Sequence, residues 1–593
     1  MEAKAQSFRF LSNEGMVKIP FFQRGYVWKD ENWDDLLTDL LDANKGHFLG
    51  SLILKQQTIR SGEPKEVLVV DGQQRLTTLS ILLKVLYDTF TADHKKNSEI
   101  DLRNNLFHKR YPTDGEYLIK IQHSRVDAEA YQRVISAGID GSPIENVDDS
   151  SNKILSCYGY FLKELREKSE DDRASLFNRI LDPENRMLVV IDLAEGDDEQ
   201  DIFDTINSSG VRLSCADTIK NALFQKAIQL LNQSKAIDLY NKTWEKVFLA
   251  DDETIDFWET ERITGRFRRN NIEIMLHCVA VIEGFYDPDQ HTLSDLPKLY
   301  KKKIAKCSSK DELIFFINEI KDYADTYRER ILSFDSSTLF SFNNSNGTQR
   351  LFHILETLQI STFHPFILFV FRKYIGDEYN ISRLLSSLEK YVVRRMISGQ
   401  ETKSYNKLCR DFILNPDTLV EKAGEASDEE ISVGLRKAIS NKNAALLLFW
   451  VELYRRNNDN KFDMKELKDS YSLEHIMPQK WEQYWKLIPE KQNTDGSTMS
   501  HEEAKKDRYE KVYWLGNMTL LTSSLNSSLR NHDFEKKMNG EGSKKGIKAY
   551  AFLSITKDDI VFKFESGDTV WDESKIIART SNLQKEILQI WGN

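Results

Sequence analysis

Ser472-Leu-Glu-His-Ile-Met-Pro-Gln479 places a carboxylate beside an imidazole, and Trp514-Leu-Gly-Asn-Met-Thr-Leu-Leu521 follows it along the chain. The two stretches are typical of the strands and turn of a hairpin, and Asn526 would lie on the helix that comes next. A carboxylate, an imidazole and two asparagines provide the groups of a one-metal phosphodiesterase, namely ligands for a divalent ion, a general base and an orienting amide. We therefore expect this ββα layout to carry the chemistry.

The composition indicates a large and mainly helical protein. A chain of 593 residues is too long for one core, so we expect roughly three domains. The 26 glycines and 11 prolines are a small share, which favours long helices over turn-rich sheets. The net charge of -11 argues against a surface that is basic throughout, although local Lys and Arg patches could still bind phosphates.

The cysteines and the apolar runs exclude several classes of protein. The five cysteines are widely spaced without a C-x-x-C pair, which argues against a zinc knuckle and against a disulfide framework. The first residues lack the apolar core of a signal peptide, and no apolar run approaches the ~20 residues of a membrane span. We expect a soluble, cytoplasmic protein.

A second cluster of chemistry lies near the N-terminus. Ile19-Pro-Phe-Phe-Gln-Arg-Gly-Tyr-Val-Trp28 is rich in aromatic residues. Glu66-Val-Leu-Val-Val70 predicts a strand, and Asp71-Gly-Gln-Gln-Arg75 predicts a glycine turn and the start of a helix. The free N–H groups at a helix start attract phosphate, and Arg75 could add a bidentate contact. A structural alternative is that Asp71 caps the helix and pairs with Arg75.

A third motif, Val211-Arg-Leu-Ser-Cys-Ala-Asp-Thr-Ile-Lys-Asn221, follows a capped helix predicted from Asp197 to Asn207. Asn207, Arg212, Asp217 and Lys220 are polar groups among apolar neighbours. They either complete a ligand site or tie a loop to a helix.

Together these motifs resemble a known domain. I-P-x-F-Q-R-x-Y-x-W, V-D-G-Q-Q-R-L-T-T-L and F-x-T-I-N-S-x-G-x-x-L-x-x-A-D-x-I-K-N are similar to the S-type domain of the GmrSD type IV restriction enzymes, which is related to the ParB/sulfiredoxin fold. The resemblance implies that residues 1–230 bind and hydrolyse a nucleoside triphosphate and help to sense modified DNA. The nucleotide-binding residues that it implies are Gln23, Arg24, Asp71, Gly72, Gln73, Arg75, Asn207 and Lys220.

Residues 231–416 read as a helical bridging domain, because apolar residues recur there at helical spacing. The basic segment Arg262-Ile-Thr-Gly-Arg-Phe-Arg-Arg269 interleaves Phe267 with arginines, which would suit a phosphate backbone and a stacked base. Charge clusters of this kind are more often solvated faces or internal ion pairs. The DNA-contact candidates here are Arg266, Arg268 and Arg269.

Residues 417–593 contain E-H-I-x-P-Q, L-G-N-x-T-L-L and S-x-x-N-S-S-L, which resemble HNH endonucleases and, more closely, the D-type domain of GmrSD enzymes. The resemblance implies that His475 is the general base and that Glu474 and Asn526 hold Mg²⁺ or Mn²⁺. It implies that Asn517 orients the His475 ring through the hairpin backbone. Lysines close after Asn526 supply positive charge for a phosphate backbone, with Lys536 and Lys537 as the DNA-contact candidates.

Two features depart from the family pattern. The interval between His475 and Asn517 is longer than a compact hairpin needs, so Trp481 to Lys511 would be an insertion packed outside the motif. Glu474 stands where Asp is common in HNH proteins, which lengthens the ligand arm.

The sequence thus predicts a mainly α protein with α+β domains: a ParB/sulfiredoxin-like N-terminal domain, a helical middle, and a ββα-metal (HNH) nuclease within a helical C-terminal domain. The function that the resemblance implies is NTP-regulated, Mg²⁺-dependent cleavage of modified phage DNA, such as DNA with glucosylated hydroxymethylcytosine or phosphorothioate linkages. The expected partners are double-stranded DNA and a nucleoside triphosphate. The sequence does not distinguish among GTP, UTP, CTP and ATP as the preferred nucleotide. A homo-oligomer is allowed, and no membrane is involved.

Two alternatives stay open. One is an NTP-gated DNA-binding clamp of ParB type, in which the HNH-like part is structural. The other is a nuclease toxin that acts on unmodified DNA or on RNA. The Glu474–His475 pair with its two asparagines argues against the clamp, and the elaborate N-terminal motifs argue against an ungated toxin.

Overall fold

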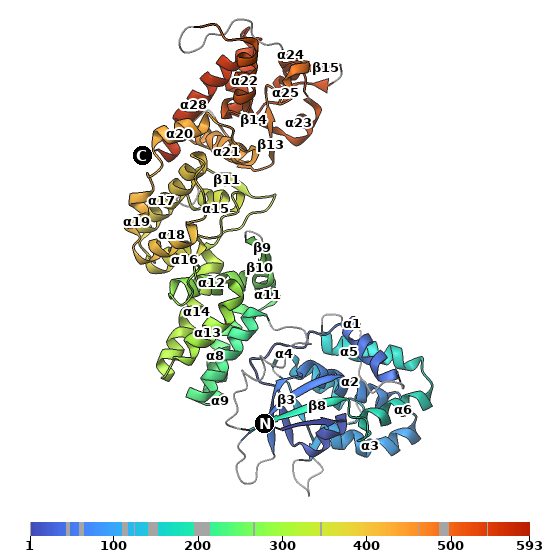
Figure 1. Cartoon of the computed structure of the whole chain (residues 1–593). Helices are drawn as coiled ribbons and strands as arrows, with labels where there is room; N and C mark the ends of the chain where they lie inside the picture. The colour runs from blue at the N-terminus through green and yellow to red at the C-terminus, as the bar shows by residue number, and fades with distance from the viewer. Residues whose placement is uncertain are drawn as a thin grey trace. The chain divides into compact units, whose positions relative to one another are not determined.

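The computed structural model divides into two compact units, residues Met1–Asn241 and Lys242–Asn593, and each is described by itself (Figure 1). The predicted division at 230 and 416 stays a prediction. The structure describes residues 2–42, 48–57, 65–109, 117–123, 125–139, 152–194, 214–264, 267–343, 347–460, 462–485, 497–529, 531–542 and 544–592.

The first unit is built on a six-stranded mixed sheet with the strand order β1-β8-β3-β4-β2-β7. The pairs β3–β8, β2–β4 and β2–β7 are parallel, whereas β1–β8 and β3–β4 are antiparallel. The parallel pairs join segments that are far apart in the sequence, so helices must connect them. The strands are β1 (Glu2–Gln6), β2 (Met16–Lys18), β3 (Gly50–Gln56), β4 (Glu66–Asp71), β7 (Ile121–Gln122) and β8 (Leu188–Leu193).

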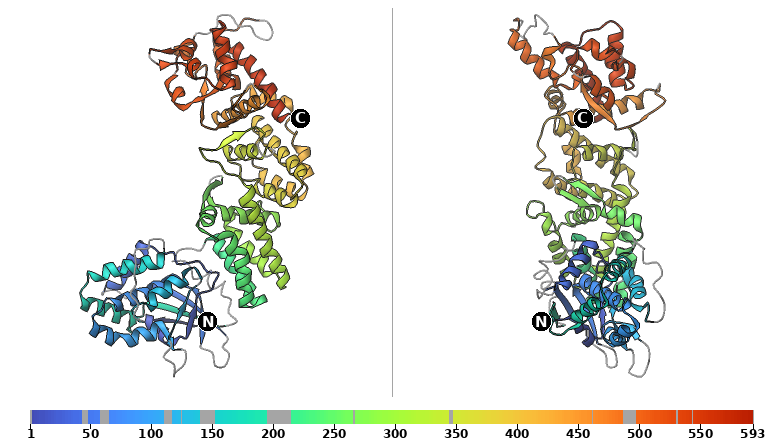
Figure 2. Two further views of the ribbon diagram at one scale, coloured as in Figure 1. Left: turned by 180° about the vertical axis from the view of Figure 1, so that it is seen from behind. Right: turned by 90° about the vertical axis from the view of Figure 1, so that its right-hand side faces the viewer.

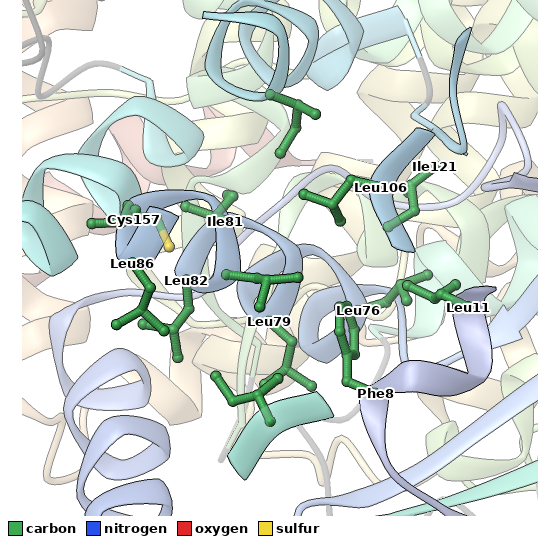
Figure 3. Packing of buried hydrophobic residues seen from close by; sticks show 14 of the residues in the cluster. Phe8, Leu11, Leu76, Leu79, Ile81, Leu82, Leu86, Leu106, Ile121 and Cys157 are labelled. Atoms are coloured by element: carbon green, nitrogen blue, oxygen red, sulfur yellow. The ribbon is translucent and has the colours of Figure 1, made fainter. Parts of the chain in front are cut away.

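Helix α2 (Gln73–Asp88) is the centre of the first unit's core. Its side chains from Leu76 to Tyr87 are buried, which explains why this stretch is apolar nearly all round. Figure 3 shows Leu76 near Phe8, Leu11 and Ile121. The helices around α2 lie against one face of the sheet (Figures 1 and 2). They are α1 (Asp30–Leu41), α3 (Ala92–Leu106), α4 (Arg125–Ser136), α5 (Lys153–Arg166) and α6 (Glu170–Leu181), with the short η1 (Phe8–Asn13) and the small hairpin β5 (Phe107–Lys109) and β6 (Tyr117–Ile119).

The first unit ends with α8 (Cys215–Leu231) and α9 (Gln233–Tyr240). Ser214 caps α8 by accepting a hydrogen bond from Asp217 N. Phe224 on α8 and Tyr240 on α9 contact the ring of Phe21 edge-on, at centroid distances of 6.2 and 5.2 Å. Both helices therefore pack against the aromatic loop that the sequence singles out.

The second unit is mostly helical up to residue 458. Side-chain caps begin several of its helices, for example at Asp251, Ser309 and Ser440. The helices are α10 (Lys246–Phe248), α11 (Asp252–Glu259), α12 (Asn271–Ile282), α13 (Leu296–Ala305), α14 (Lys310–Arg330), α15 (Thr348–Thr357), α16 (His364–Lys373), α17 (Glu378–Ile397), α18 (Tyr405–Leu414), α19 (Asp417–Lys422), α20 (Asp428–Leu435) and α21 (Asn441–Asn458).

The basic segment of this part is a hairpin of two short strands, β9 (Glu261–Thr264) and β10 (Phe267–Asn270), and not a helix. Strand β11 (Leu339–Ser341) pairs with β12 (Glu466–Lys468), which ties the helical part to the segment just before the Glu-His pair.

Strands β13 (Tyr471–His475) and β14 (Met518–Thr522) form an antiparallel two-stranded sheet, and α23 (Ser523–Leu529) follows β14 directly. The predicted strands and helix of this region are thereby confirmed. The surrounding elements are α22 (His501–Val512), η6 (Leu515–Asn517), α24 (Phe534–Asn539), β15 (Gly540–Glu541), β16 (Lys544–Lys545), α25 (Ile547–Tyr550), α26 (Ser554–Thr556), α27 (Phe562–Glu565) and α28 (Glu573–Trp591).

The protein is mainly helical with small sheets, as its composition predicts. The ParB/sulfiredoxin-like and HNH assignments stay predictions. Within the described ranges, no helix combines the length and the apolar character that a membrane crossing requires.

Candidate functional site

Strand β13 brings Glu474 and His475 to one end of the two-stranded sheet. In its register with β14, Glu474 lies opposite Thr519 and His475 lies opposite Met518. The ladder continues past the strand end, because Ile476 N donates to Asn517 O at 2.9 Å. In an antiparallel pair, alternate residues direct their N–H and C=O groups toward the partner strand. Leu473 and His475 therefore direct their carbonyl oxygens to the edge that faces away from β14.

Two side chains from the following helices bind those edge carbonyls. Asn526 Nδ2 on α23 donates to Leu473 O at 2.8 Å and to Ser472 Oγ at 3.0 Å. Lys537 Nζ on α24 donates to His475 O at 2.8 Å. Because Asn526 uses its amide nitrogen for the strand, its amide oxygen is the atom left for a ligand. The edge of β13 thus fixes where Asn526 stands relative to Glu474.

Glu474 shares an ion pair with Lys537. Its Oε1 lies 2.5 Å from Lys537 Nζ, and the lysine side chain is fully buried. Burial raises the pKa of Glu474, and the Lys537 ammonium offsets part of that rise. Burial lowers the pKa of Lys537, although the carboxylate opposes this change. We take the pair as charged, since two ionised groups in contact compensate each other's loss of water.

His475 is 9% exposed, and its Nε2 has no hydrogen-bond partner among the described residues. Burial, and next the repulsion from Lys537, lower the pKa of His475 to about 4. The ring is therefore neutral near pH 7. A neutral ring nitrogen without a partner is able to accept a proton.

Asn517 holds the backbone just beyond His475. Its side chain is fully buried and uses both ends. Oδ1 accepts from Met477 N at 2.9 Å and from Trp571 Nε1 at 3.1 Å. Nδ2 donates to Met477 O at 2.8 Å and to Val512 O at 2.9 Å. Asn517 thus acts on the turn after His475 and makes no contact with the imidazole in these bonds.

A metal ion at this place would have oxygen ligands from a carboxylate and an amide. Among the residues that the structure describes, no three His, Cys, Asp or Glu side chains form a cluster able to hold a metal. Glu474 Oε2 and Asn526 Oδ1 are the two side-chain oxygens that the bonds to Lys537 and to the edge of β13 leave over. Such hard donors fit Mg²⁺ or Mn²⁺, with water or substrate completing the shell.

The predicted DNA contacts fall into different environments. Lys536 is exposed and pairs with Glu541 at 2.8 Å, and Arg268 on β10 is exposed. Arg269 is half-buried, and Arg266 lies outside the described residues. Lys537 corrects the sequence-based prediction, because its buried ammonium faces Glu474 and offers no surface to a DNA backbone.

The N-terminal candidate residues gather where β4 meets α2. Gly72 is the N-cap residue of α2 with a φ of 90°, and the cap has no side-chain bond, so Asp71 does not occupy the cap position. A Cβ on Gly72 would lie 2.3 Å from Leu52 Cδ2 and 2.9 Å from Ser51 O. Arg75 Nη1 donates to Ser51 O at 3.2 Å. Only glycine allows this close approach of β3 to the start of α2.

Glutamines tie the aromatic loop to this turn. Gln23 Nε2 donates to Val69 O at 2.7 Å, and Gln73 Nε2 donates to Arg24 O at 3.0 Å. Sequence reasoning missed Gln74. Its Oε1 accepts from Val27 N at 2.8 Å, and its Nε2 donates to Gly25 O at 3.0 Å. The doubled glutamine in D-G-Q-Q-R was the available signal, and the second glutamine bridges the loop from both ends of its amide.

Charged groups of opposite sign meet at the same turn. Burial lowers the pKa of Arg24, and Asp217 and Asp71 oppose that change. Burial also raises the pKa of Asp71, against the effects of Gly72 N–H, Arg75 and Arg24. Lys220 is buried and pairs with Asp217 at 2.7 Å. The structure thus brings α8 to the start of α2, whereas Asn207, Arg212 and the predicted helix at 197–207 lie outside the described residues.

Comparison with known families assigns both ends of the chain. Residues 8–224 match the family described as GmrSD restriction endonuclease, N-terminal domain. Residues 426–586 match the family described as GmrSD restriction endonucleases, C-terminal domain. No curated protein matches the chain. The first match covers the glycine turn of α2, and the second covers the whole β13–β14–α23 site.

Proposed function

Because the chain belongs to the GmrSD family of restriction endonucleases, whose N- and C-terminal domains it carries in order, we propose that the β13–β14–α23 site cuts the backbone of modified foreign DNA. The cut depends on a divalent metal ion and is regulated by a nucleoside triphosphate bound at the start of α2. His475 is the general base, and Glu474 with Asn526 holds the ion.

The observation that carries this proposal is the state of His475. The Nε2 atom is buried without a partner among the described residues, and the low pKa keeps the ring neutral. His353 uses both ring nitrogens, with Asp469 at 3.0 Å and Trp450 at 3.1 Å, whereas His364 and His532 each have a ring nitrogen that is buried without a partner among the described residues, as His475 does. Only His475 of these three directly follows a carboxylate, Glu474, that would hold a metal ion. His475 thus combines a free ring nitrogen, which a base needs in order to take a proton from water, with a neighbouring ligand group.

The residues around His475 support the remaining parts of the reaction. Glu474 Oε2 and Asn526 Oδ1 would hold Mg²⁺ or Mn²⁺, which when bound stabilises charge on the phosphate and on the leaving oxygen. Asn517 keeps the turn after His475 in place through Met477. Low exposure of the ring limits competing contacts with bulk water.

Exposed basic residues of the second unit would bind the DNA backbone. Lys536 follows the site on α24, and the exposed Arg268 lies on the β10 strand of the hairpin, next to the half-buried Arg269. Such contacts provide affinity without sequence preference. Recognition of the modification would then depend on the first unit, as the family resemblance implies.

The start of α2 supports a nucleotide site in the first unit. The αL conformation of Gly72 lets β3 lie against the start of α2, and α2 has no side-chain cap on its first N–H groups, which would be the donors to a phosphate. Arg24 and Arg75 both lower the pKa of Asp71 by their positive charge, so they are the proposed phosphate contacts near this turn. Gln23 and Gln73 already bind backbone carbonyls and would shape the site.

A panel of matched DNAs tests the proposal. Unmodified, hydroxymethylated, glucosylated and phosphorothioated duplexes of one sequence are incubated with the full chain and Mg²⁺, with and without each of GTP, UTP, CTP and ATP. The proposal predicts selective, NTP-dependent cutting of one modified DNA. Equal cutting of all four DNAs would indicate an ungated nuclease, and NTP-dependent binding without cutting would indicate a clamp.

A further inference from the structure

Lys537 differs from its neighbour on the same short helix. The side chain of Lys537 is fully buried, whereas the side chain of Lys536 is 46% exposed. Asp533 caps helix α24 by accepting a hydrogen bond from Lys536 N at 2.9 Å, and the helix buries Phe534 and Met538. This packing turns Lys537 toward the end of β13 and leaves Lys536 at the surface.

The Lys537 ammonium contacts both residues of the Glu-His pair. It lies 2.5 Å from Glu474 Oε1 and 2.8 Å from His475 O. A buried ammonium is costly unless charged and polar partners surround it, so this placement requires both contacts. One donor group therefore fixes the side chain of the first residue and the main chain of the second.

These contacts define which oxygen of Glu474 can serve a ligand. Oε1 is taken by the ammonium, which leaves Oε2 for a metal ion. Asn526 is bound to the same strand edge, two residues earlier, through Leu473 O. The two helices after β14 are thus anchored at alternate carbonyls of β13, and these anchors set the spacing of the two candidate ligand oxygens.

We propose that Lys537 is a positioning residue of the nuclease site, which holds Glu474 for the metal ion and fixes the strand end that carries His475, and that it does not contact DNA. This inference rests on the function proposed above. It differs from the sequence-based prediction, in which Lys537 binds a DNA phosphate. It also differs from a purely structural role, in which the ion pair only stabilises the fold.

The full chain with Lys537→Met tests the proposal, with Lys563→Met, an exposed lysine of α27, as the matched control. Methionine keeps most of the side-chain length and removes the ammonium. We expect Mn²⁺ affinity, measured by calorimetry without DNA, to fall by about tenfold or more, as for other residues that orient metal ligands. We expect kcat to fall by a similar or larger factor while KM for DNA stays within about twofold, since no DNA contact is lost. Lys563→Met should match the wild type.

Other results would overturn the proposal. Unchanged Mn²⁺ affinity and kcat would reduce Lys537 to a structural role. Tighter Mn²⁺ binding would show that the ammonium competes with the ion. A raised KM with kcat retained would establish a DNA contact. Wild-type protein that neither binds Mn²⁺ nor cuts DNA would overturn the proposed function as well, whereas metal-dependent cutting that ignores Lys537→Met would overturn this inference alone.

A second variant covers a failure of Lys537→Met to fold. In the Lys537→Met/Glu474→Gln double variant, no unpaired carboxylate stays buried. If the two groups form the pair described here, thermal unfolding should show the double variant to be more stable than Lys537→Met alone, although Glu474 is also lost. Equal or lower stability of the double variant would contradict the pair and with it the proposed positioning role.

Discussion

Asn526 and Leu473, which are 53 residues apart in the sequence, are joined by a hydrogen bond of 2.8 Å from the amide nitrogen to the carbonyl oxygen. The bond fastens α23 to the outer edge of β13, one residue before Glu474. The two ends of the Asn526 amide therefore have different roles: the nitrogen binds the strand, and the oxygen is left for an ion. The outer edge of β13 therefore sets the position of Asn526 in the proposed metal site.

Asn526→Ala should remove a metal ligand and an anchor together. We expect Mn²⁺ affinity to fall by about 10- to 100-fold and DNA cleavage to fall by at least as much. Calorimetry and a single-turnover cleavage assay provide the two measurements. Ser527→Ala, an exposed neighbour on α23, is the control and should behave as wild type. Full activity of Asn526→Ala would contradict its assignment as a ligand.

Asn517→Ala should act through stability and through the turn after His475. The substitution leaves Met477 N, Met477 O and other buried groups without partners, which predicts a loss of about 3 kcal/mol in the free energy of unfolding. Urea unfolding of the variant checks this value, with Asn458→Ala, an exposed asparagine at the end of α21, as control. If the two variants unfold alike, Asn517 does not hold the turn.

Gly72→Ala should disrupt the start of α2. The methyl group would press on Leu52 and Ser51 in a left-handed backbone conformation, so we expect a loss of about 2 kcal/mol or more in stability together with weaker nucleotide binding. Gly138→Ala is a matched control, because its φ is 72° but its new Cβ would meet nothing closer than 3.6 Å. Thermal unfolding and nucleotide titration of both variants separate crowding from backbone strain.

The stability of the first unit should fall in acid because of His123. Burial lowers the pKa of His123 to about 3, and the centroid of its ring lies 4.2 Å from the centroid of the Tyr131 ring. Below pH ~6.5, His123 binds a proton in the unfolded chain but stays neutral in the folded chain. The free energy of unfolding therefore decreases as the pH falls toward 3. Between pH 7 and pH 5, His123 should lower the free energy of unfolding by about 2 kcal/mol. Urea unfolding at both pH values should show a smaller difference for His123→Gln than for wild type, and an equal difference would contradict the prediction.

Exposed basic residues should govern the salt dependence of DNA binding. Lys536→Met and Arg268→Met should each weaken binding to modified and unmodified DNA alike, and each should reduce the slope of log affinity against log salt by about 0.9. Binding titrations at several salt concentrations measure this slope. If a variant changes the preference for modified DNA but keeps the slope, the substituted residue contacts the modified group of the DNA and not its backbone.

The elements of the nuclease site could be predicted because their signals are local. Apolar residues alternate with polar ones along β13, β14 is a short apolar run, and the motif spacing places Asn526 on the next helix. Contacts over long intervals could not be predicted in the same way. In the sequence, Lys537 has the features of a surface lysine, and only the packing of α24 places its ammonium against Glu474. Asn517 accepts a hydrogen bond from Trp571, which lies 54 residues later in the sequence.

The N-terminal motifs show the same division. The glycine turn before α2 follows from V-D-G-Q-Q-R, and the buried strand before it follows from its apolar run. The bond between Arg75 and Ser51 O requires β3 to lie beside β4, which no local pattern specifies. The hairpin of β9 and β10 was missed because its strands are short and charged, so their residues do not alternate as in a half-buried strand.

If His475 is the base of a metal-dependent DNA endonuclease, removal of its imidazole should stop cleavage without unfolding the protein. Wild type, His475→Ala and His501→Ala are compared on the modified DNA that the wild type cuts, with Mg²⁺ and nucleotide present. His501 is an exposed histidine at the start of α22 and serves as the matched control. We expect His475→Ala to retain its fold and Mn²⁺ affinity but to cut at least about 1,000-fold more slowly, while His501→Ala cuts at the wild-type rate. Cutting by His475→Ala at the wild-type rate would contradict this role of His475.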